Sequence, residues 1–122
     1  GSRRASGPRR AHREGRKDRL NRVGLTASLL EREAIRYTPA GVPIVGLKLS
    51  HRSVQREAGT DRTVEMEISA IAADRMALRI DRIALGTGLK LEGFLAPRRR
   101  NVKALVLHVT DFELDPTVER TA

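Results

Sequence analysis

The sequence predicts an all-β domain: a five-stranded OB-fold barrel with a short helix between strands three and four. Two patterns lead to this prediction. Apolar and polar side chains alternate in five separate segments, as in strands that bury one face. Between the third and fourth segments the apolar spacing changes to that of a helix. Another small β-barrel or a fragment of a β-sandwich would also fit this order, and the pattern alone leaves both open.

Strands one to three are predicted within residues 21–70. A turn is expected between the first two strands, because Pro39 presets φ for a turn and Gly41 suits its end. Residues 53–61 have little apolar content and one glycine, so we expect a hairpin loop before strand three. The alternating apolar positions are Val23, Leu25, Ala27 and Leu29, then Val45, Leu47 and Leu49, then Val64, Met66, Ile68 and Ala70.

The helix is predicted over residues 74–84, with Asp74 at its N-terminal end and Gly86 just past its C-terminal end. Strand four follows over residues 89–95. Strand five begins at residue 105 and runs to residue 114, because the Asp-Pro pair that follows ends a strand. The apolar positions with helical spacing are Met76, Ala77, Ile80, Ile83 and Ala84.

The composition limits the class of protein. A chain of 122 residues suits one domain. The absence of cysteine excludes a disulfide framework, a thiolate nucleophile and a cysteine-based zinc site. No apolar run approaches the ~18 residues that a membrane helix needs, so we expect no membrane partner. One tyrosine, two phenylalanines and no tryptophan leave the core to aliphatic side chains.

We divide the chain into three parts. Residues 1–20 are interpreted as a disordered basic tail, partly vector-derived, because Arg, Gly and Pro dominate and no apolar period occurs. Residues 21–115 form the predicted OB-fold domain, and residues 116–122 a short C-terminal tail. The formal net charge of +9 favours a polyanionic partner, with nucleic acid ahead of an anionic membrane surface.

Motifs in the predicted domain resemble two related bacterial families. NRVGL at residues 21–25 and RYTPAG at residues 36–41 resemble the opening of single-stranded-DNA-binding proteins. HRSVQREAG at residues 51–59 is more specific and is similar to the PriB family, primosomal replication protein N. The similarity continues through GFL at residues 93–95 and VLH at residues 106–108. It extends to residue 114 and covers nearly all of the predicted domain.

The resemblance implies a cytoplasmic, nucleoid-associated homodimer of OB-folds that binds single-stranded DNA in bacterial replication restart. It also implies partners in the primosome, because the family bridges the restart helicase and the loader-recruiting protein. Two alternatives remain open. One is a protein-interaction adaptor of the primosome with weak DNA binding. The other is a general single-stranded-DNA-binding protein, usually a tetramer.

Seven cations are the predicted DNA-binding residues. Four of them occupy the loop between strands four and five, which is one wall of the oligonucleotide site in OB-folds. Cations gathered on one loop repel each other unless an anion binds, so this pattern favours a phosphate clamp. The other three lie at strand ends and match basic positions of the resembled family. The loop cations are Arg98, Arg99, Arg100 and Lys103, and the strand-end cations are Arg36, Arg52 and Arg62.

The sequence departs from the resembled family at positions that stack bases. Family members place aromatic residues just after the EAG run and early in strand three, where this chain has Thr60 and Glu65. Tyr37 is a candidate for base stacking, although it could equally pack against a turn. Phe94 and Phe112 fall within apolar strands, so we expect them in the core or in a dimer interface.

The chain shows no catalytic or metal-binding pattern. His12, His51 and His108 lack the spacing of metal ligands, and neither a nucleophile elbow nor a phosphate-binding glycine loop occurs. We therefore expect no enzymatic activity, no metal site and no cofactor. His51 is assigned to holding a strand end rather than to DNA, and His108 to a partly buried, hydrogen-bonded position.

Overall fold

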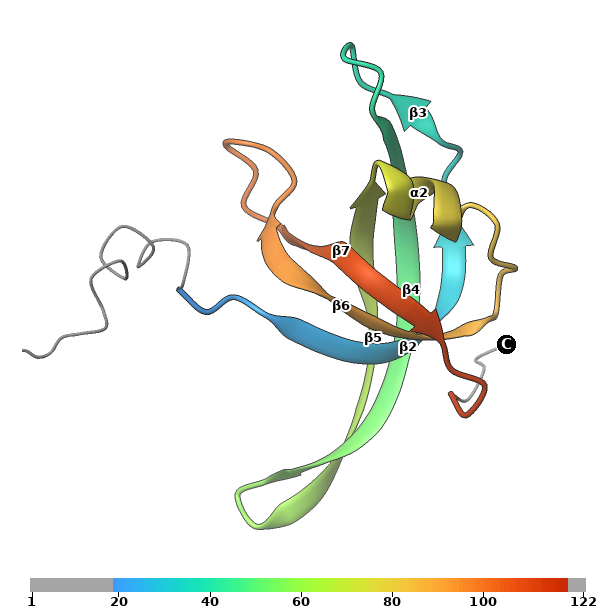
Figure 1. The fold of residues 1–122 in the computed structure, drawn as a ribbon. Coiled ribbons are helices and arrows are strands. Elements are labelled where there is room, and N and C mark those ends of the chain that lie inside the picture. Colours follow the sequence, from blue (N-terminus) through green and yellow to red (C-terminus); the bar gives the residue numbers. More distant parts are fainter. Residues whose placement is uncertain (1–18, 119–122) are drawn as a thin grey trace, which may run out of the picture.

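Six strands and one helix make up residues 19–118, the part of the chain that the computed structural model describes (Figure 1). Most of the predicted N-terminal tail, residues 1–18, and the end of the C-terminal tail, residues 119–122, lie outside the described residues. The elements in chain order are β2 (Val23–Arg32), β3 (Arg36–Tyr37), β4 (Pro43–Glu57), β5 (Thr60–Ala73), α2 (Arg75–Ile80), β6 (Gly88–Pro97) and β7 (Leu105–Leu114).

Five of the strands close into a barrel. Strand β2 pairs antiparallel with both β4 and β6, and β6 pairs antiparallel with β7. Strand β7 then lies parallel to β5, and β5 returns to β4 in an antiparallel pairing, which completes the circle. This closed all-β barrel with one short helix confirms the predicted OB-fold.

The helix lies where the change of apolar period predicts it, between β5 and β6. The sequence did not reveal β3, a two-residue strand that pairs Arg36 with Ile44 and Tyr37 with Pro43. Because β3 comes second in the chain, the helix follows the fourth strand rather than the third. The turn after β3 is confirmed: the Thr38 amide donates to the Val42 carbonyl at 3.0 Å, and Gly41 has a φ of 85°.

The helix is shorter than predicted and ends at Ile80 instead of residue 84. Arg32 of β2 accounts for its end. The Arg32 Nη1 donates to the carbonyl oxygens of Ile80, at 3.3 Å, and of Ile83. Its Nε lies 3.7 Å from the Asp81 carboxylate. A guanidinium that binds the last carbonyls of a helix stabilises the chain as it leaves the helical conformation.

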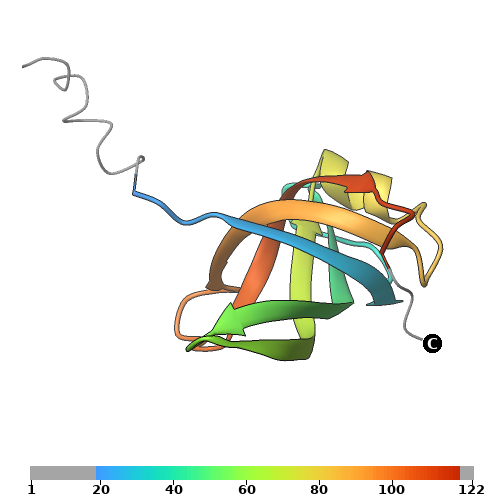
Figure 2. The ribbon, with the colours of Figure 1, turned by 90° about the horizontal axis from the view of Figure 1, so that it is seen from below.

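The predicted hairpin joins β4 and β5, but both strands continue beyond the barrel as a two-stranded ribbon, so the predicted loop over residues 53–61 was too long. The turn consists of Ala58 and Gly59, with φ of 52° and 82°. Two central residues with positive φ match the twist of the flanking strands. Figures 1 and 2 show the ribbon projecting from the barrel on the side away from α2. Its side chains are mostly polar because both its faces reach solvent.

The barrel is filled by aliphatic side chains, as the composition predicts. Ala77 and Ile80 of α2 are fully buried and close one end of the core. Phe112 is 7% exposed and belongs to this core. Phe94 does not, because it is 38% exposed on the outer side of the barrel. The strand residues of the core include Leu29, Leu47, Leu49, Leu89, Leu91 and Leu107.

Candidate nucleic-acid interface

The loop between β6 and β7 carries the densest positive charge of the described residues. The strands end at the pair Pro97 and Leu105, and the loop spans residues 98–104. The Val102 amide donates to the Arg99 carbonyl at 3.3 Å, which closes a tight turn. Asn101 has a φ of 69°, a conformation that asparagine tolerates better than most residues. This turn presents the arginines before Asn101 at the tip of the loop.

No carboxylate among residues 19–118 forms an ion pair with the four predicted loop cations, which are Arg98, Arg99, Arg100 and Lys103. All four are exposed. Their mutual repulsion is relieved when an anion comes between them, and guanidinium groups form strong paired hydrogen bonds with phosphate oxygens. The structure therefore brings these four predicted residues together on one exposed loop, which we call the cationic loop.

A groove of about 180 Å³ lies beside the cationic loop. Its floor is the outer face of β4 and β5, where Lys48 pairs with Ser69 in the register of the two strands. Arg98 and Val106 form the wall next to the loop. Lys48 was not among the predicted DNA-binding residues. Its alternation with the inward-facing Leu47 and Leu49 placed it on the outer face, but a single lysine gave no reason to select it.

Two glutamates line the same groove and reduce its positive potential. Glu33 folds its carboxylate over Gly46, where a larger residue would collide with it. The Glu33 Oε1 lies 3.9 Å from Arg36 Nη1. Glu31 precedes Arg32 in β2 and also lines the groove. The Arg32 guanidinium donates hydrogen bonds to carbonyl oxygens at the end of α2. Lys48 and Arg98 are thus the groove cations that remain available for a phosphate.

Arg36 and Tyr37 lie on β3, and this strand and the cationic loop rise from the same end of the barrel (Figure 1). Arg36 is exposed, and Tyr37 is 64% exposed. A ring this open is not packed into the turn. Both side chains are therefore open to solvent at this end of the barrel.

Arg52 and Arg62 lie elsewhere, on the ribbon. Arg52 pairs in register with Glu65, and its Nε is 3.0 Å from that carboxylate. Arg62 pairs with Gln55, three positions further along β4, and therefore points to the opposite face. The Arg62 Nη1 lies 2.7 Å from the Glu57 Oε1. The structure thus divides the seven predicted cations into two groups, and the ribbon group is balanced by carboxylates.

His51 is held inside the structure. It is 8% exposed, and its Nδ1 lies 2.7 Å from the carbonyl oxygen of Thr26. A carbonyl only accepts hydrogen bonds, so Nδ1 carries the proton and Nε2 accepts from the Ser53 hydroxyl, also at 2.7 Å. Gln55 completes the chain by donating to the Ser53 Oγ at 3.0 Å. These bonds fasten β4 to β2 and support the structural role expected for His51.

Phe94 and His108 face each other across β6 and β7. Their ring centroids are 5.0 Å apart and the ring planes differ by 7°, so the rings are stacked. The buried Nε2 of His108 has no hydrogen-bond partner among the described residues. The expectation that His108 is partly buried is confirmed, but this nitrogen is not hydrogen bonded.

Comparison with known proteins identifies the family. A family model described as another single-strand binding protein family matches residues 21–111. The replication restart protein PriB of Nitrosomonas europaea is 43% identical over 91 residues, which cover 75% of this chain and 84% of that protein. This chain belongs to the PriB family. The resemblance found in the sequence is therefore confirmed.

Other PriB relatives agree in sequence and in structure. PriB of Bordetella pertussis is 43% identical over 90 residues, covering 74% of this chain and 84% of that relative. A solved PriB structure from Ralstonia solanacearum is 51% identical and has a TM-score of 0.73. The match covers 79% of this chain and 98% of the Ralstonia chain. The range that the family model matches includes the groove, β3 and the cationic loop.

Two further properties concern residues 19–118 alone. This part of the PriB-family chain contains no group of three or more histidine or acidic side chains that could hold a metal ion. Its helix α2 has six residues, and no helix in the same range is long and apolar enough to cross a membrane.

Proposed function

We propose that this PriB-family protein binds single-stranded DNA in replication restart, through the cationic loop and the adjacent groove. The observation that carries the proposal is the set of four loop cations that have no carboxylate partner within residues 19–118, beside a groove that adds Lys48. The names of the relatives and of the matching family model support it.

The geometry gives each side chain a separate task. The cationic loop and Lys48 hold phosphates, because cationic side chains that neutralise phosphates release the counterions condensed on the single strand. Arg36 adds a further cation at the rim, and Tyr37 offers a ring to a base. We assign Arg52 and Arg62 at most a secondary part, since Glu65 and Glu57 neutralise them.

The test compares two triple variants with equal charge loss: R98Q/R99Q/R100Q on the loop and R52Q/R56Q/R62Q on the ribbon. Fluorescence anisotropy with a labelled oligothymidine is measured over a range of salt concentrations. Each phosphate contact contributes roughly 0.7 to the slope of log K against log salt. We expect the loop variant to lose about 2 units of slope and to bind at least ~10-fold more weakly at 0.1 M salt.

The ribbon variant should stay within about twofold of the wild type, because its three arginines are paired with carboxylates. Equal losses in both variants, or a wild-type slope flatter than about −1, would reject the cationic loop as the DNA site. Duplex DNA of the same length serves as the competitor that measures the preference for single strands.

We also propose a homodimer formed at the open side of β2. Strand β4 pairs with β2 at residues 28–32, and the ribbon then diverges from it. Beyond that point a groove of about 560 Å³ is lined by Leu25, Val64 and Met66. Met66 is 40% exposed. A second copy of the chain can cover these apolar side chains and the edge of β2 at residues 23–27, which pairs with no strand on this side within residues 19–118.

Sedimentation equilibrium tests the dimer with a matched pair of variants. Val64 lines this groove, whereas Val54 lies on the other face of the ribbon. We expect V64D to sediment as a monomer and V54D to keep the mass of the wild type. A monomeric wild type, or equal behaviour of the two variants, would contradict the proposed interface.

The bridging role is a finer proposal that rests on the family. In it the protein works in the bacterial cytoplasm and connects the restart helicase with the loader-recruiting protein. A pull-down with the purified helicase tests the bridging role by comparing the wild type with R98Q/R99Q/R100Q. If this variant keeps the helicase and loses oligothymidine, separate surfaces serve the two partners. The adaptor alternative is favoured if wild-type DNA affinity does not depend on the loop charge.

A further inference from the structure

We propose that Phe94, supported by His108, is a nucleobase-stacking platform that extends the DNA path from the cationic loop onto the outer face of β6 and β7. The inference rests on the proposed binding of single-stranded DNA. It adds an uncharged contact to a surface otherwise described by its cations.

The supply of aromatic rings limits where stacking can occur. The whole chain contains one tyrosine, two phenylalanines and no tryptophan. Phe112 is buried beneath α2, which leaves Tyr37 and Phe94 as the exposed rings of these types. An exposed phenylalanine is costly to hydrate, and its flat face is suited to a base. Phe94 is therefore a stronger candidate than its position in an apolar strand suggested.

The ring of Phe94 is held by a stacked neighbour. The imidazole of His108 lies almost parallel to it, at 5.0 Å and 7°, and covers one face. The remaining exposure of Phe94 leaves surface on which a base can lie. His108 Nε2 makes no hydrogen bond among the described residues, so here the imidazole serves as a flat support. A ring held in one orientation loses little conformational entropy when a ligand stacks on it.

The platform is continuous with the cationic loop. In the register of β6 and β7, Phe94 faces His108, Ala96 faces Val106, and the loop begins after Pro97. Side chains two positions apart on a strand share one face, so Phe94 and His108 lie on the same outer face as Val106. Val106 itself lines the groove with Arg98. Arg98 is the fourth residue after Phe94, which corresponds to about 13 Å of extended chain.

A further cation lies on the other side of the platform. Arg22 lines a small groove together with Gly93, the residue before Phe94. A strand leaving the loop would thus meet an aromatic ring and then another guanidinium. Cations along the backbone and rings beneath the bases are the two components of sequence-tolerant binding to single strands.

The first test is the substitution F94L, with F94Y as its matched control. Leucine keeps an apolar side chain but removes the flat ring, whereas tyrosine keeps the ring. We expect F94L to weaken binding to oligothymidine about 10-fold, while F94Y stays within about twofold of the wild type. The salt slope of F94L should equal that of the wild type, because a stacked base releases no counterion. A binding loss equal in F94L and F94Y would overturn the inference.

A second test uses the unmodified protein, so it does not depend on the folding of a variant. An oligonucleotide that contains 5-iododeoxyuridine is irradiated in the complex, and the cross-linked peptide is identified by mass spectrometry. We expect cross-links at Phe94. Cross-links confined to Tyr37, or a change in oligomer mass on F94L that shows a second copy covering the ring, would reject the platform.

The variants distinguish failure of the platform from failure of the DNA site. If F94L binds like the wild type while R98Q/R99Q/R100Q is weakened, the platform is rejected and the proposed DNA site stands. If neither set of variants changes the affinity, the DNA site itself is rejected, and the platform with it.

Discussion

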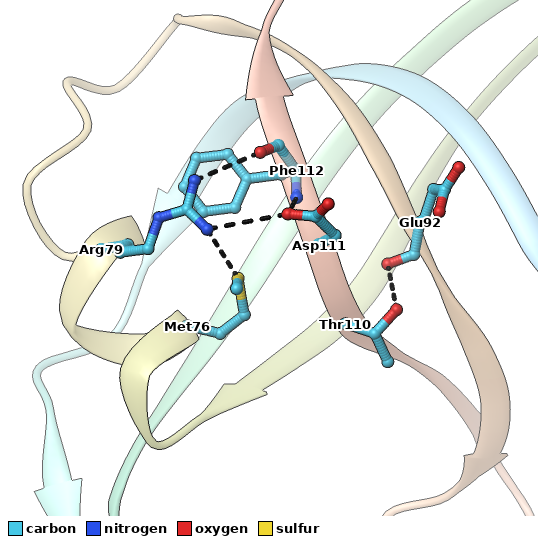
Figure 3. A network of polar contacts seen from close by, with 6 residues as sticks. All are labelled: Met76, Arg79, Glu92, Thr110, Asp111 and Phe112. Carbon is cyan, nitrogen blue, oxygen red and sulfur yellow. Dashed lines mark hydrogen bonds and ion pairs between the residues drawn. The ribbon is translucent and has the colours of Figure 1, made fainter.

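The guanidinium group of Arg79 lies over the ring of Phe112, with its central carbon 4.5 Å from the ring centroid (Figure 3). Its Nη2 donates to the carbonyl oxygen of Phe112 at 3.3 Å, and its Nη1 lies 3.6 Å from the carboxylate of Asp111. The same nitrogen is 3.7 Å from the Met76 sulfur. One side chain thus connects the short helix α2 to β7 and covers the ring of a core phenylalanine.

This connection predicts that Arg79→Ala destabilises the domain by about 1 kcal/mol, through loss of the cation–π contact and one hydrogen bond. Arg75→Ala is the matched control on the same helix, and it should change the free energy of unfolding by less than about 0.5 kcal/mol. Urea denaturation followed by circular dichroism measures both. Equal effects would show that Arg79 adds no more than an ordinary helix residue.

The close approach of β6 and β7 at Gly93 predicts a larger effect. A Cβ at Gly93 would collide with the backbone carbonyl of His108, at a bulge in the strand pairing. Backbone atoms cannot move aside as a flexible side chain can, so we expect Gly93→Ala to cost about 1–3 kcal/mol. Gly24→Ala in β2 is the control, because a Cβ there meets nothing within 4 Å. Thermal unfolding should separate the two variants by several degrees.

The carboxylates of the groove predict a gain in DNA affinity on their removal. Glu33→Gln deletes a negative charge beside Arg36 and Lys48, so we expect tighter binding to oligothymidine, by about threefold at low salt. Screening should abolish the gain near 1 M salt. The control is Glu57→Gln on the ribbon, for which no gain is expected. A similar gain in both variants would mean that net charge alone governs affinity.

The C-terminal end of β7 predicts a pH-dependent contact. The hydroxyl and amide of Thr117 donate to the Asp115 carboxylate at 2.5 and 3.0 Å, and they hold the pKa of Asp115 below its ordinary value. Because the folded pKa is lowered, the contact stabilises the fold above the unfolded pKa and is lost as the pH falls through the folded pKa. Thr117→Val should raise the pKa of Asp115 in an NMR titration. An unchanged pKa would assign the lowering to the Thr117 amide, which the variant keeps, and to the charge of Lys90, instead of to the Thr117 hydroxyl.

The barrel strands could be predicted because each buries one face, which leaves a period of two in the sequence. The ribbon over residues 53–61 could not, since exposure of both faces removes that period and imitates a loop, although Val64 and Met66 marked part of its second strand. Phe94 was assigned to the core or a dimer interface from its apolar surroundings. The alternation of Leu89, Leu91 and Gly93 already placed it on the outer face, so this part of the error could have been avoided.

The cationic loop could also be predicted, because consecutive arginines remain together in any fold. The grouping of distant cations could not. Arg52 and Arg62 fall on opposite faces of the ribbon through the register of β4 and β5, which depends on a two-residue turn that the sequence did not reveal. Lys48 and Arg98 line one groove although they are distant in the sequence, because the closure of the barrel brings their segments together.

The ribbon beyond Ser50 and Glu67 rests on a single pair of strands within one chain, whereas the barrel segments have neighbours on both sides. Isolated two-stranded hairpins are marginally stable in water. Amide hydrogens on β4 should therefore exchange with deuterium in two classes: slowly at residues 45–50 and quickly at residues 52–57. The position of the boundary, and its movement when protein concentration or oligonucleotide is raised, reports which molecule covers the ribbon in solution.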